Sequence, residues 1–357
     1  MEAIVFDDTG LSWRDDVELA RRPAPHEVIV EVTAAGVCHS DLKVITGATP
    51  YPLPVVLGHE GTGRVVAVGD AVGSVAVGET VVIHTLRFCG RCDRCAAGYP
   101  TQCRRALGGI GQPFVIGREP VNQFANTSVF TERTIVSEEQ VVAIDPAIRP
   151  VCAALLGCGV LTGAGAVFNR ARVTRGDRVV VLGVGGVGLN VVQASAIAGA
   201  SVVIAVDTNP DKEAAARAFG ATQFVLGGDG VGDRIKEIEP TGVDHAFVCI
   251  GSAPLVALAA SLLDAGGQAV IVGFPGPGIN AQIPLERLYH DKSILACRYG
   301  TSSPHRDIPL LAELYLAGRL KLDELVTRTL PLAEAPAAFD DMVAGRVEAR
   351  TVLRIGD

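Results

Sequence analysis

The chain has no excess of basic residues and no obvious long apolar run. Its 31 lysines and arginines are outnumbered by 39 aspartates and glutamates, and the formal net charge is -8. Nucleic-acid binding requires a basic face, so no nucleic-acid partner is expected. No run of about 18 apolar residues stands out, so no membrane span is expected either.

The N-terminus also lacks the features of a secretory signal. It reads MEAIVFDDTG, with Asp7 and Asp8 in place of a basic start and an apolar core. We therefore expect a cytoplasmic protein, whose nine cysteines are metal ligands or free thiols rather than disulfides. No low-complexity tract or internal repeat is visible. The 357 residues, 48% hydrophobic and 20% charged, indicate a globular protein of two domains.

Four of the cysteines are spaced as C-x2-C-x2-C-x7-C. They are Cys89, Cys92, Cys95 and Cys103. Four thiolates so close in sequence can surround one zinc ion tetrahedrally, and a zinc with four protein ligands has no open position for a substrate. The spacing therefore predicts a structural zinc that holds a lobe at residues 87–105.

The pattern of apolar residues changes along the chain. To about residue 150, short alternating stretches bounded by Gly and Pro predict a β-rich domain. Beyond about residue 155, apolar runs alternate with helical segments, which predicts an α/β domain with a doubly wound parallel sheet. The expected strands are 28–32, 64–68, 81–83, 179–182, 202–206, 224–226, 246–248 and 269–272, and the expected helices are 189–198, 212–219 and 308–317.

A glycine-rich turn follows the first of the expected parallel strands. Gly183 to Gly188 reads GVGGVG, which fits G-x-G-x-x-G, and Asp207 ends the next strand. This order predicts a dinucleotide site, in which Gly183 permits the turn, Gly185 admits the pyrophosphate and Gly188 allows close helix packing. Asp207 would bind the ribose hydroxyls and repel a 2′-phosphate, so NAD is favoured over NADP. The alternative is a turn without a ligand, with Asp207 as a helix cap.

Three short segments carry further cysteines and histidines: Cys38-His39-Ser40-Asp41, Gly58-His59-Glu60-Gly61 and Gly157-Cys158-Gly159. Each alone is compatible with a buried small residue or a core histidine. In their order along the chain, however, GVCHSD, GHEGTG, the four-cysteine segment, GCG and GVGGVG resemble the zinc-dependent alcohol dehydrogenases of the medium-chain dehydrogenase/reductase superfamily. The similarity extends over essentially the whole chain.

This resemblance implies a GroES-like catalytic domain and a Rossmann coenzyme domain. The expected boundaries are 1–158 for the catalytic domain, 159–298 for the NAD-binding domain and 299–357 for a return to the catalytic domain. The implied activity is the reversible, NAD-linked oxidation of a primary or secondary alcohol to an aldehyde or ketone. Two zinc ions per chain are implied, as is a homo-oligomer, with a dimer favoured over a tetramer.

The resemblance also assigns roles to individual residues. It implies a catalytic zinc held by Cys38, His59 and Cys158, with an open position at which the metal lowers the pKa of an alcohol. Glu60 would lie near this metal, and Asp41 would orient the His59 ring. Ser40 would contact the substrate oxygen and pass on its proton.

A second set of matches concerns the coenzyme. His39 and Arg350 match residues at the pyrophosphate, Thr162 and Val187 match residues beside the nicotinamide, and Lys212 matches a lysine near the adenosine ribose. Gly183, Gly185, Gly186 and Gly188 would line the phosphates. Lys212 and Arg350 are also compatible with solvated surface charges.

Three positions depart from the family pattern. Lys43 stands where many relatives have a histidine at the outer end of the proton relay. A lysine, with a pKa near about 10.4, is a poor base at neutral pH, so we expect the relay to end at the coenzyme ribose and water. Leu107 replaces an arginine of the glutathione-dependent formaldehyde dehydrogenases, although Arg104 and Arg105 are close. Thr85 replaces a pocket aromatic and predicts a roomier pocket.

Three alternatives to a free-alcohol dehydrogenase remain open. The first is an aldehyde or formaldehyde dehydrogenase that acts on a thiol adduct on the same scaffold. The second is a non-catalytic zinc-ribbon interaction protein with a vestigial dinucleotide fold. The third, a zinc-free quinone reductase relative, is disfavoured by the two sets of metal-ligand residues. Cys152, Cys249 and Cys297 have no role in any of these and are expected to be buried small residues.

Overall fold

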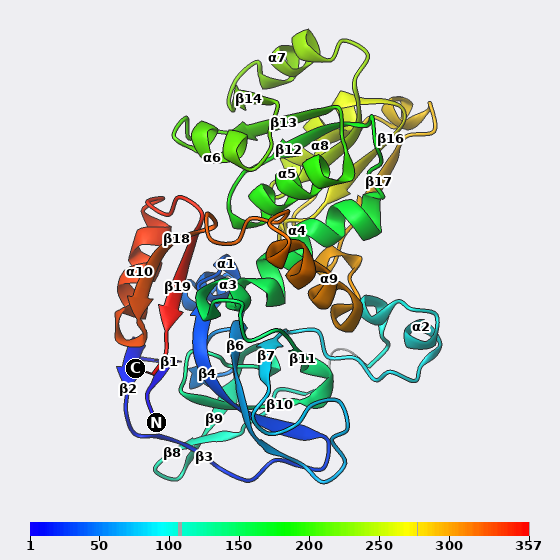
Figure 1. The fold of residues 1–357 in the computed structure, drawn as a ribbon. Helices are drawn as coiled ribbons and strands as arrows, with labels where there is room; N and C mark the ends of the chain where they lie inside the picture. The colour runs from blue at the N-terminus through cyan, green and yellow to red at the C-terminus, as the bar shows by residue number, and fades with distance from the viewer. Residues whose placement is uncertain (106–108, 277, 357) are drawn as a thin grey trace. The chain divides into compact units, whose positions relative to one another are not determined.

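The computed structural model of the protein describes residues 1–105, 109–276 and 278–356. The chain forms two compact units, coloured along the sequence in Figure 1. The first comprises Met1–Cys158, Ser303–Gly318 and Leu322–Asp357, and the second comprises Gly159–Ser302 and Arg319–Lys321.

The first unit is built mainly from antiparallel strands. Its larger sheet has the order β11-β7-β6-β4-β19-β18, and β10 also pairs with β4. Along β4 the side chains of Val28, Val30 and Val32 are buried, as the two-residue period of a strand requires when one face packs on a core. The strands are β4 (Glu27–Gly36), β6 (Glu60–Val68), β7 (Thr80–Ile83), β10 (Arg133–Ser137), β11 (Val141–Ala143), β18 (Val326–Pro331) and β19 (Arg350–Arg354).

A second sheet and several helices complete this unit. The sheet has the order β2-β1-β5-β9-β8-β3. Its strands are β1 (Ala3–Asp7), β2 (Gly10–Arg14), β3 (Val17–Leu19), β5 (Val55–Val56), β8 (Phe114–Ile116) and β9 (Glu119–Gln123). The α-helices are α1 (His39–Ile45), α2 (Asp93–Ala96), α3 (Pro150–Leu155), α9 (Pro304–Leu316) and α10 (Ala335–Val343).

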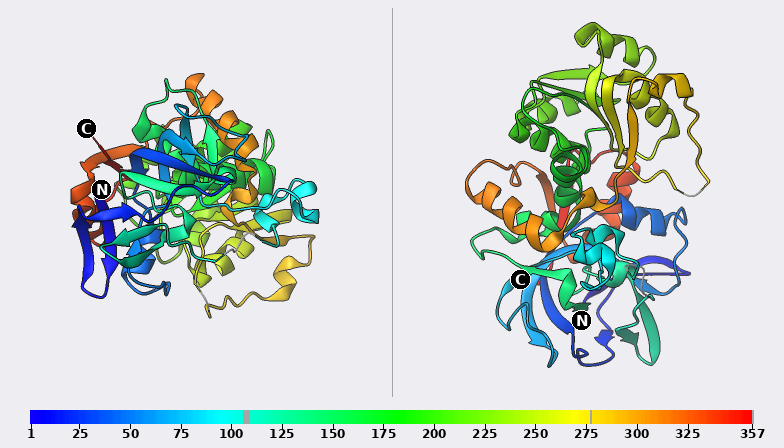
Figure 2. Two further views of the ribbon diagram at one scale, coloured as in Figure 1. Left: turned by 90° about the horizontal axis from the view of Figure 1, so that it is seen from below. Right: turned by 90° about the vertical axis from the view of Figure 1, so that its right-hand side faces the viewer.

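The second unit is a parallel sheet with the strand order β14-β13-β12-β15-β16-β17. The order runs outward from β12 in both directions, so it reverses between β12 and β15, and helices cover both faces of the sheet (Figure 2). Dinucleotides bind at such a reversal, beyond the carboxyl ends of the strands. The strands are β12 (Arg178–Leu182), β13 (Val202–Asp207), β14 (Gln223–Leu226), β15 (Val243–Val248), β16 (Leu263–Ile271) and β17 (Ser293–Ala296). The α-helices are α4 (Leu161–Gly165), α5 (Gly186–Ala198), α6 (Lys212–Ala218), α7 (Val231–Ile238) and α8 (Ala253–Leu262).

The expected fold, a β-rich GroES-like part and a Rossmann sheet, is confirmed, but a long apolar helix and the regular elements after residue 316 were not expected. Pro150–Ala171 is a helical stretch of 22 residues with a mean hydropathy of 2.0, long and apolar enough by composition to cross a membrane. In its most apolar 18-residue window, 78% of the residues are buried inside the protein, as in a core helix. The region after residue 299 is also more regular than expected, because β18, β19 and α10 follow α9.

Candidate functional site

Three segments that are far apart in the sequence converge in the first unit. Cys38 directly precedes α1, just beyond the end of β4. His59 directly precedes β6, which pairs with β4 so that Gly36 lies opposite Glu60. Cys158 lies in the π-helical segment η4 (Leu156–Val160), which continues from α3, and α3 packs against β4 and β6. The pairing of β4 with β6 and the packing of α3 therefore determine the position of the site.

The converging side chains form a set of metal-ligand groups. One ligand atom from each of Cys38, His59, Glu60 and Cys158 lies within 4.8 Å of the others. The Cys158 thiol and the His59 ring hold the pKa of the Cys38 thiol well below its ordinary value. A thiolate is the form of cysteine that binds a metal.

The orientation of His59 also fits a metal ligand. Its Nδ1 lies 3.2 Å from Oδ1 of Asp41, which also accepts a 3.0 Å hydrogen bond from the Gly58 N–H. Its Nε2 is buried and has no hydrogen-bond partner among the described residues. A histidine that ligates a metal through one ring nitrogen usually has the other held by a carboxylate in this way. The two thiols and this nitrogen fit zinc, which takes sulfur and nitrogen ligands.

Glu60 and Arg350 form an ion pair beside these ligands. Arg350 donates through Nη2 to Oε2 of Glu60, and the side chains are only 7% and 0% exposed, respectively. Burial raises the pKa of Glu60 to about 7, although the Arg350 charge opposes this shift. Gly36 leaves room for the pair, since a Cβ there would lie 2.7 Å from Oε2 of Glu60. Arg350 is thus not a solvated surface charge, and sequence analysis did not detect its pairing with Glu60.

Two further groups lie next to the ligand set. The Cys38 thiol is 3.9 Å from the hydroxyl oxygen of Ser40, which is exposed in the first turn of α1 beside His39. The ring of Phe124 packs edge-on against His59, with 5.6 Å between ring centroids. Phe124 follows β9 and was not expected at this site, because nothing near it in the sequence marks it as different from any other core aromatic.

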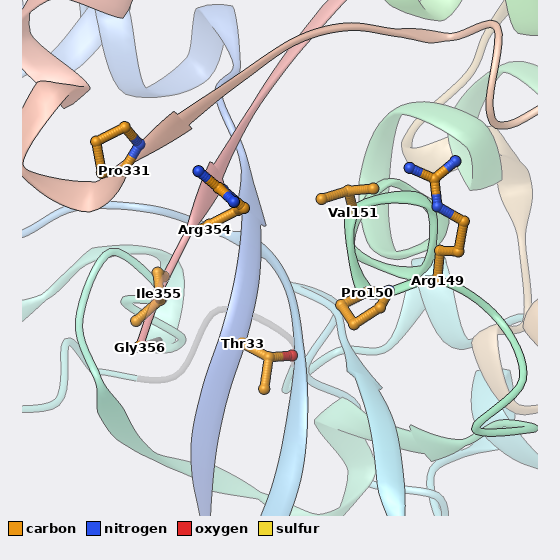
Figure 3. Close-up of a pocket in the computed structure, with 8 residues that line it drawn as sticks. All are labelled: Thr33, Arg149, Pro150, Val151, Pro331, Arg354, Ile355 and Gly356. Atoms are coloured by element: carbon orange, nitrogen blue, oxygen red, sulfur yellow. The ribbon is translucent and has the colours of Figure 1, made fainter.

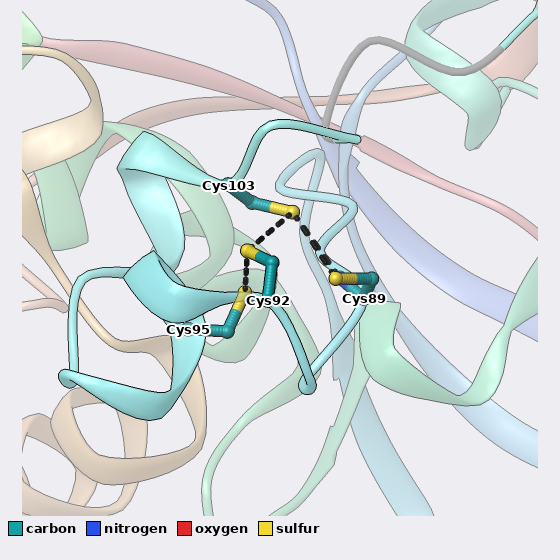
Figure 4. A group of neighbouring side chains, drawn as sticks. All are labelled: Cys89, Cys92, Cys95 and Cys103. Carbon is teal, nitrogen blue, oxygen red and sulfur yellow. Dashed lines mark hydrogen bonds between the residues drawn. The ribbon is translucent and has the colours of Figure 1, made fainter.

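The four-cysteine segment also forms one cluster (Figure 4). The sulfur of Cys92 lies 3.5 Å from that of Cys95 and 4.0 Å from that of Cys103, which lies 3.7 Å from the sulfur of Cys89. A zinc tetrahedron with Zn–S bonds of about 2.3 Å has edges of about 3.8 Å, whereas a disulfide would need about 2.05 Å. Backbone N–H groups of Cys95 and Arg104 lower the pKa of Cys92 to about 6. The cluster therefore fits a closed zinc site.

The glycine-rich turn in the second unit has room for a ligand. Gly183 has a φ of 91°, which favours glycine. A Cβ on Gly188 would collide with the Gly183 carbonyl, whereas a Cβ on Gly185 would meet no atom within 4 Å. The open side of Gly185 is where a pyrophosphate approaches in this fold, next to the N-terminus of α5, which begins at Gly186.

Asp207 lies at the end of β13, directly beside this turn. Its Oδ2 accepts a 2.9 Å hydrogen bond from the Val184 N–H, and its Oδ1 accepts one of 3.0 Å from the Asn209 N–H. Both bonds fix the carboxylate at the carboxyl edge of the sheet. Asp207 is therefore not a helix cap of α6, which begins five residues later at Lys212.

The other residues of the second unit that we expect to contact the coenzyme are Thr162, Val187 and Lys212. Thr162 lies in α4, and its neighbour Gly163 packs so closely on α5 that a Cβ there would lie 2.6 Å from the Val187 carbonyl oxygen. Thr162 and Val187 therefore belong to adjoining helices. Lys212 is the first residue of α6 and is partly buried.

The remaining residues singled out in the sequence have varied surroundings. Cys152 and Cys297 are buried, whereas Cys249 is only partly buried. Thr85 follows β7 and is partly buried. Leu107 lies outside the described residues.

Comparison with known proteins agrees with this geometry. Residues 24–146 match the alcohol dehydrogenase GroES-like domain, and residues 186–316 match the zinc-binding dehydrogenase family. An S-(hydroxymethyl)glutathione dehydrogenase of Photobacterium damsela subsp. piscicida is 37% identical over 344 residues, which cover 93% of each chain.

Solved structures extend the similarity to the whole fold. An alcohol dehydrogenase zinc-binding domain protein from Burkholderia ambifaria matches with a TM-score of 0.93 and 34% identity, covering 100% of this chain and 99% of the other. Benzyl alcohol dehydrogenase from Acinetobacter calcoaceticus matches with a TM-score of 0.93 and 32% identity, covering 99% of each chain.

Proposed function

Because the chain belongs to the zinc-dependent alcohol dehydrogenase family of the medium-chain dehydrogenase/reductase superfamily, we propose that it oxidises a primary or secondary alcohol with NAD as hydride acceptor. The observation that carries this proposal is the convergence of Cys38, His59 and Cys158, with the Ser40 hydroxyl beside them. An interaction protein with a vestigial dinucleotide fold would not need this second set of metal ligands. A zinc ion held there would act as a Lewis acid that lowers the pKa of the alcohol.

The side chains around the ligands have separate tasks. Asp41 holds the His59 ring through Nδ1, which leaves the buried Nε2 as the ligand atom. Ser40 would accept the proton of the alcohol while it passes its own hydroxyl proton on to the coenzyme ribose and water, because its hydroxyl is exposed and adjoins Cys38. Lys43 is not an essential base in this scheme. Lys43→Ala should therefore retain turnover and its pH profile, whereas Ser40→Ala should lose about 10²-fold or more in kcat, as removal of a proton-transfer group does.

The second unit positions the coenzyme. The open face of Gly185 and the N-terminus of α5 would hold the pyrophosphate, and Asp207 would accept hydrogen bonds from the adenosine ribose. A 2′-phosphate would meet the Asp207 charge, so the proposed coenzyme is NAD.

Two substrate classes are supported by different observations. The benzyl alcohol dehydrogenase among the solved structures supports a free alcohol, as do Thr85 in place of a pocket aromatic and Leu107 in place of an arginine. The S-(hydroxymethyl)glutathione dehydrogenases among the relatives support a thiol adduct. We place the free alcohol first, because the basic residue expected for a glutathione carboxylate is missing at position 107.

Initial rates of NADH formation distinguish the two classes. The substrates are benzyl alcohol, ethanol, 2-propanol, and formaldehyde mixed with glutathione, with Cys38→Ala as the background. We expect kcat/KM for benzyl alcohol to exceed that for the adduct at least tenfold. The reverse order would establish the thiol-adduct activity, and no NADH from any substrate with a zinc-loaded protein would contradict both.

A further inference from the structure

A groove on the first unit has not been assigned a role by the proposed function. Its volume is about 620 Å³, within the range of about 300–1,000 Å³ that is typical of small-molecule sites. Figure 3 shows the side chains around it. The lining residues are Thr33, Arg149, Pro150, Val151, Pro331, Arg354, Ile355 and Gly356.

The groove is separate from the zinc-ligand residues, although the same elements form both. Thr33 lies on β4 five residues before Cys38, which corresponds to about 16 Å along an extended chain. Arg354 lies on β19 four residues after Arg350, about 13 Å away. Pro150 lies eight residues before Cys158 in a helical segment, about 12 Å away. Along each of these three elements, the groove therefore lies about 12–16 Å from the residues around the proposed zinc site.

Among the residues that the structure describes, no acidic side chain pairs with the guanidinium group of Arg354 in this groove. Arg149 is paired with Asp323. Arg354 is exposed and forms no ion pair or side-chain hydrogen bond with any residue in the described part of the chain. An exposed guanidinium group without an acidic partner attracts anions. Such a group is unexpected in a protein with a net charge of -8.

The walls beside this arginine are mostly apolar. Val151 lies between Arg354 and Arg149 in Figure 3, with Pro150 below it and Pro331 and Ile355 on the strands at the other side. The backbone is also well fixed here, because Arg354 pairs with Ala34 of β4 and with Pro331 of β18. A ligand for these surroundings needs one negative group and a short apolar body.

We propose that this groove binds a small organic carboxylate with a short alkyl chain. The carboxylate meets the planar Arg354 guanidinium, which can donate two parallel hydrogen bonds to it. The alkyl chain packs on Pro150, Val151 and Ile355, where burial of its apolar surface favours binding. An inorganic phosphate ion has no apolar part, so it would interact only with the charge of the Arg354 guanidinium.

Isothermal titration of the zinc-loaded protein with sodium hexanoate tests this site. Hexanol and inorganic phosphate serve as probes of the apolar and the anionic part alone. Hexanoate should bind at an Arg354-dependent site, with a Kd raised at least tenfold in Arg354→Gln and unchanged in Arg217→Gln. Arg217 is a suitable control, because it is a half-exposed arginine of the second unit that pairs with Glu213.

A second variant guards against a folding defect. Thr33 is exposed on β4, and Thr33→Glu places a like charge in the groove, so it should weaken hexanoate binding to a similar extent. The proposal is overturned if hexanoate binds the wild type and Arg354→Gln equally, which would place it at the zinc ligands. It is equally overturned if hexanol or phosphate binds as tightly as hexanoate, or if no hexanoate binds.

Discussion

Arg350, in strand β19, forms a buried ion pair with Glu60, the residue that follows His59. The two residues are 290 positions apart in the sequence. Burying a charge is strongly unfavourable unless the charge is paired, so each partner depends on the other. The pair therefore links the C-terminal part of the chain to the proposed zinc ligands.

Arg350→Met should lower the free energy of unfolding of the first unit by about 3–5 kcal/mol, because Glu60 is left buried and unpaired. Fluorescence of Trp13, the single tryptophan, follows the urea unfolding of this unit. Arg346→Met is the control, because Arg346 is 61% exposed and pairs with Asp341 at the surface, where a pair is worth about 1 kcal/mol or less. Equal effects of the two substitutions would refute the structural role of the pair.

The two cysteine clusters should respond differently to substitution. Cys92→Ala opens the structural site, so the protein should lose one zinc per chain and unfold at a lower urea concentration. Cys38→Ala should also lose one zinc but keep its fold while losing turnover. Zinc analysis and Trp13 fluorescence together check both outcomes. A stable Cys92→Ala protein that still holds two zinc ions would show that the four-cysteine assignment is wrong.

Coenzyme choice should depend on the charge of Asp207. Asp207→Asn keeps the shape of the side chain and one of the two oxygens that accept hydrogen bonds from the Val184 and Asn209 N–H groups, but removes the like charge that a 2′-phosphate would meet. The ratio of kcat/KM for NADP to that for NAD should rise about 10–100-fold, or about 1.4–2.7 kcal/mol. Asp211→Asn, at an exposed position just before α6, should leave this ratio unchanged. A ratio unaltered by Asp207→Asn would exclude this role of the carboxylate.

How far the sequence predicts the structure depends on whether a feature is local. The turn from Gly183 to Gly188 and the strand ending at Asp207 follow from neighbouring residues, so their positions were predictable. Helix α5 begins at Gly186, three residues before the expected Leu189, because glycines carry no helical signal of their own.

Features made by distant residues were not predictable from the residues alone. The convergence of Cys38, His59 and Cys158 required the family resemblance, since no spacing brings α3 to the paired strands β4 and β6. Nothing in the sequence indicated the ion pair between Glu60 and Arg350, because an arginine in a strand is more often exposed. The Arg354 groove could not be predicted either, since its walls come from four separate parts of the chain.

A buried histidine should make the protein sensitive to acid. His84 is fully buried, with His305 of α9 facing its ring and the Glu139 backbone carbonyl nearby, and burial lowers its pKa to about 3. Its unfolded pKa is about 6.5, so only the unfolded state gains a proton between these values. Stability is therefore complete above about pH 6.5 and falls as the pH drops, by about 2 kcal/mol at pH 5.

His84→Leu removes this source of acid sensitivity. The loss in unfolding free energy between pH 7.5 and pH 5, measured by urea unfolding, should be smaller in His84→Leu than in the wild type by about 2 kcal/mol. His26→Gln is the matched control, because that histidine is 68% exposed and pairs with Glu138 at the surface. The same pH dependence in the wild type and His84→Leu would contradict the assignment.

Cys38, His59 and Cys158 are the proposed reactive centre of an NAD-dependent dehydrogenase. The most direct test of this proposal is the initial rate of NADH formation from benzyl alcohol by the zinc-loaded wild type and by Cys158→Ala. We predict saturable NADH formation by the wild type, and a rate at the background level for a folded Cys158→Ala protein that keeps one zinc per chain. Undiminished NADH formation by that variant would show that Cys158 is not part of the reactive centre.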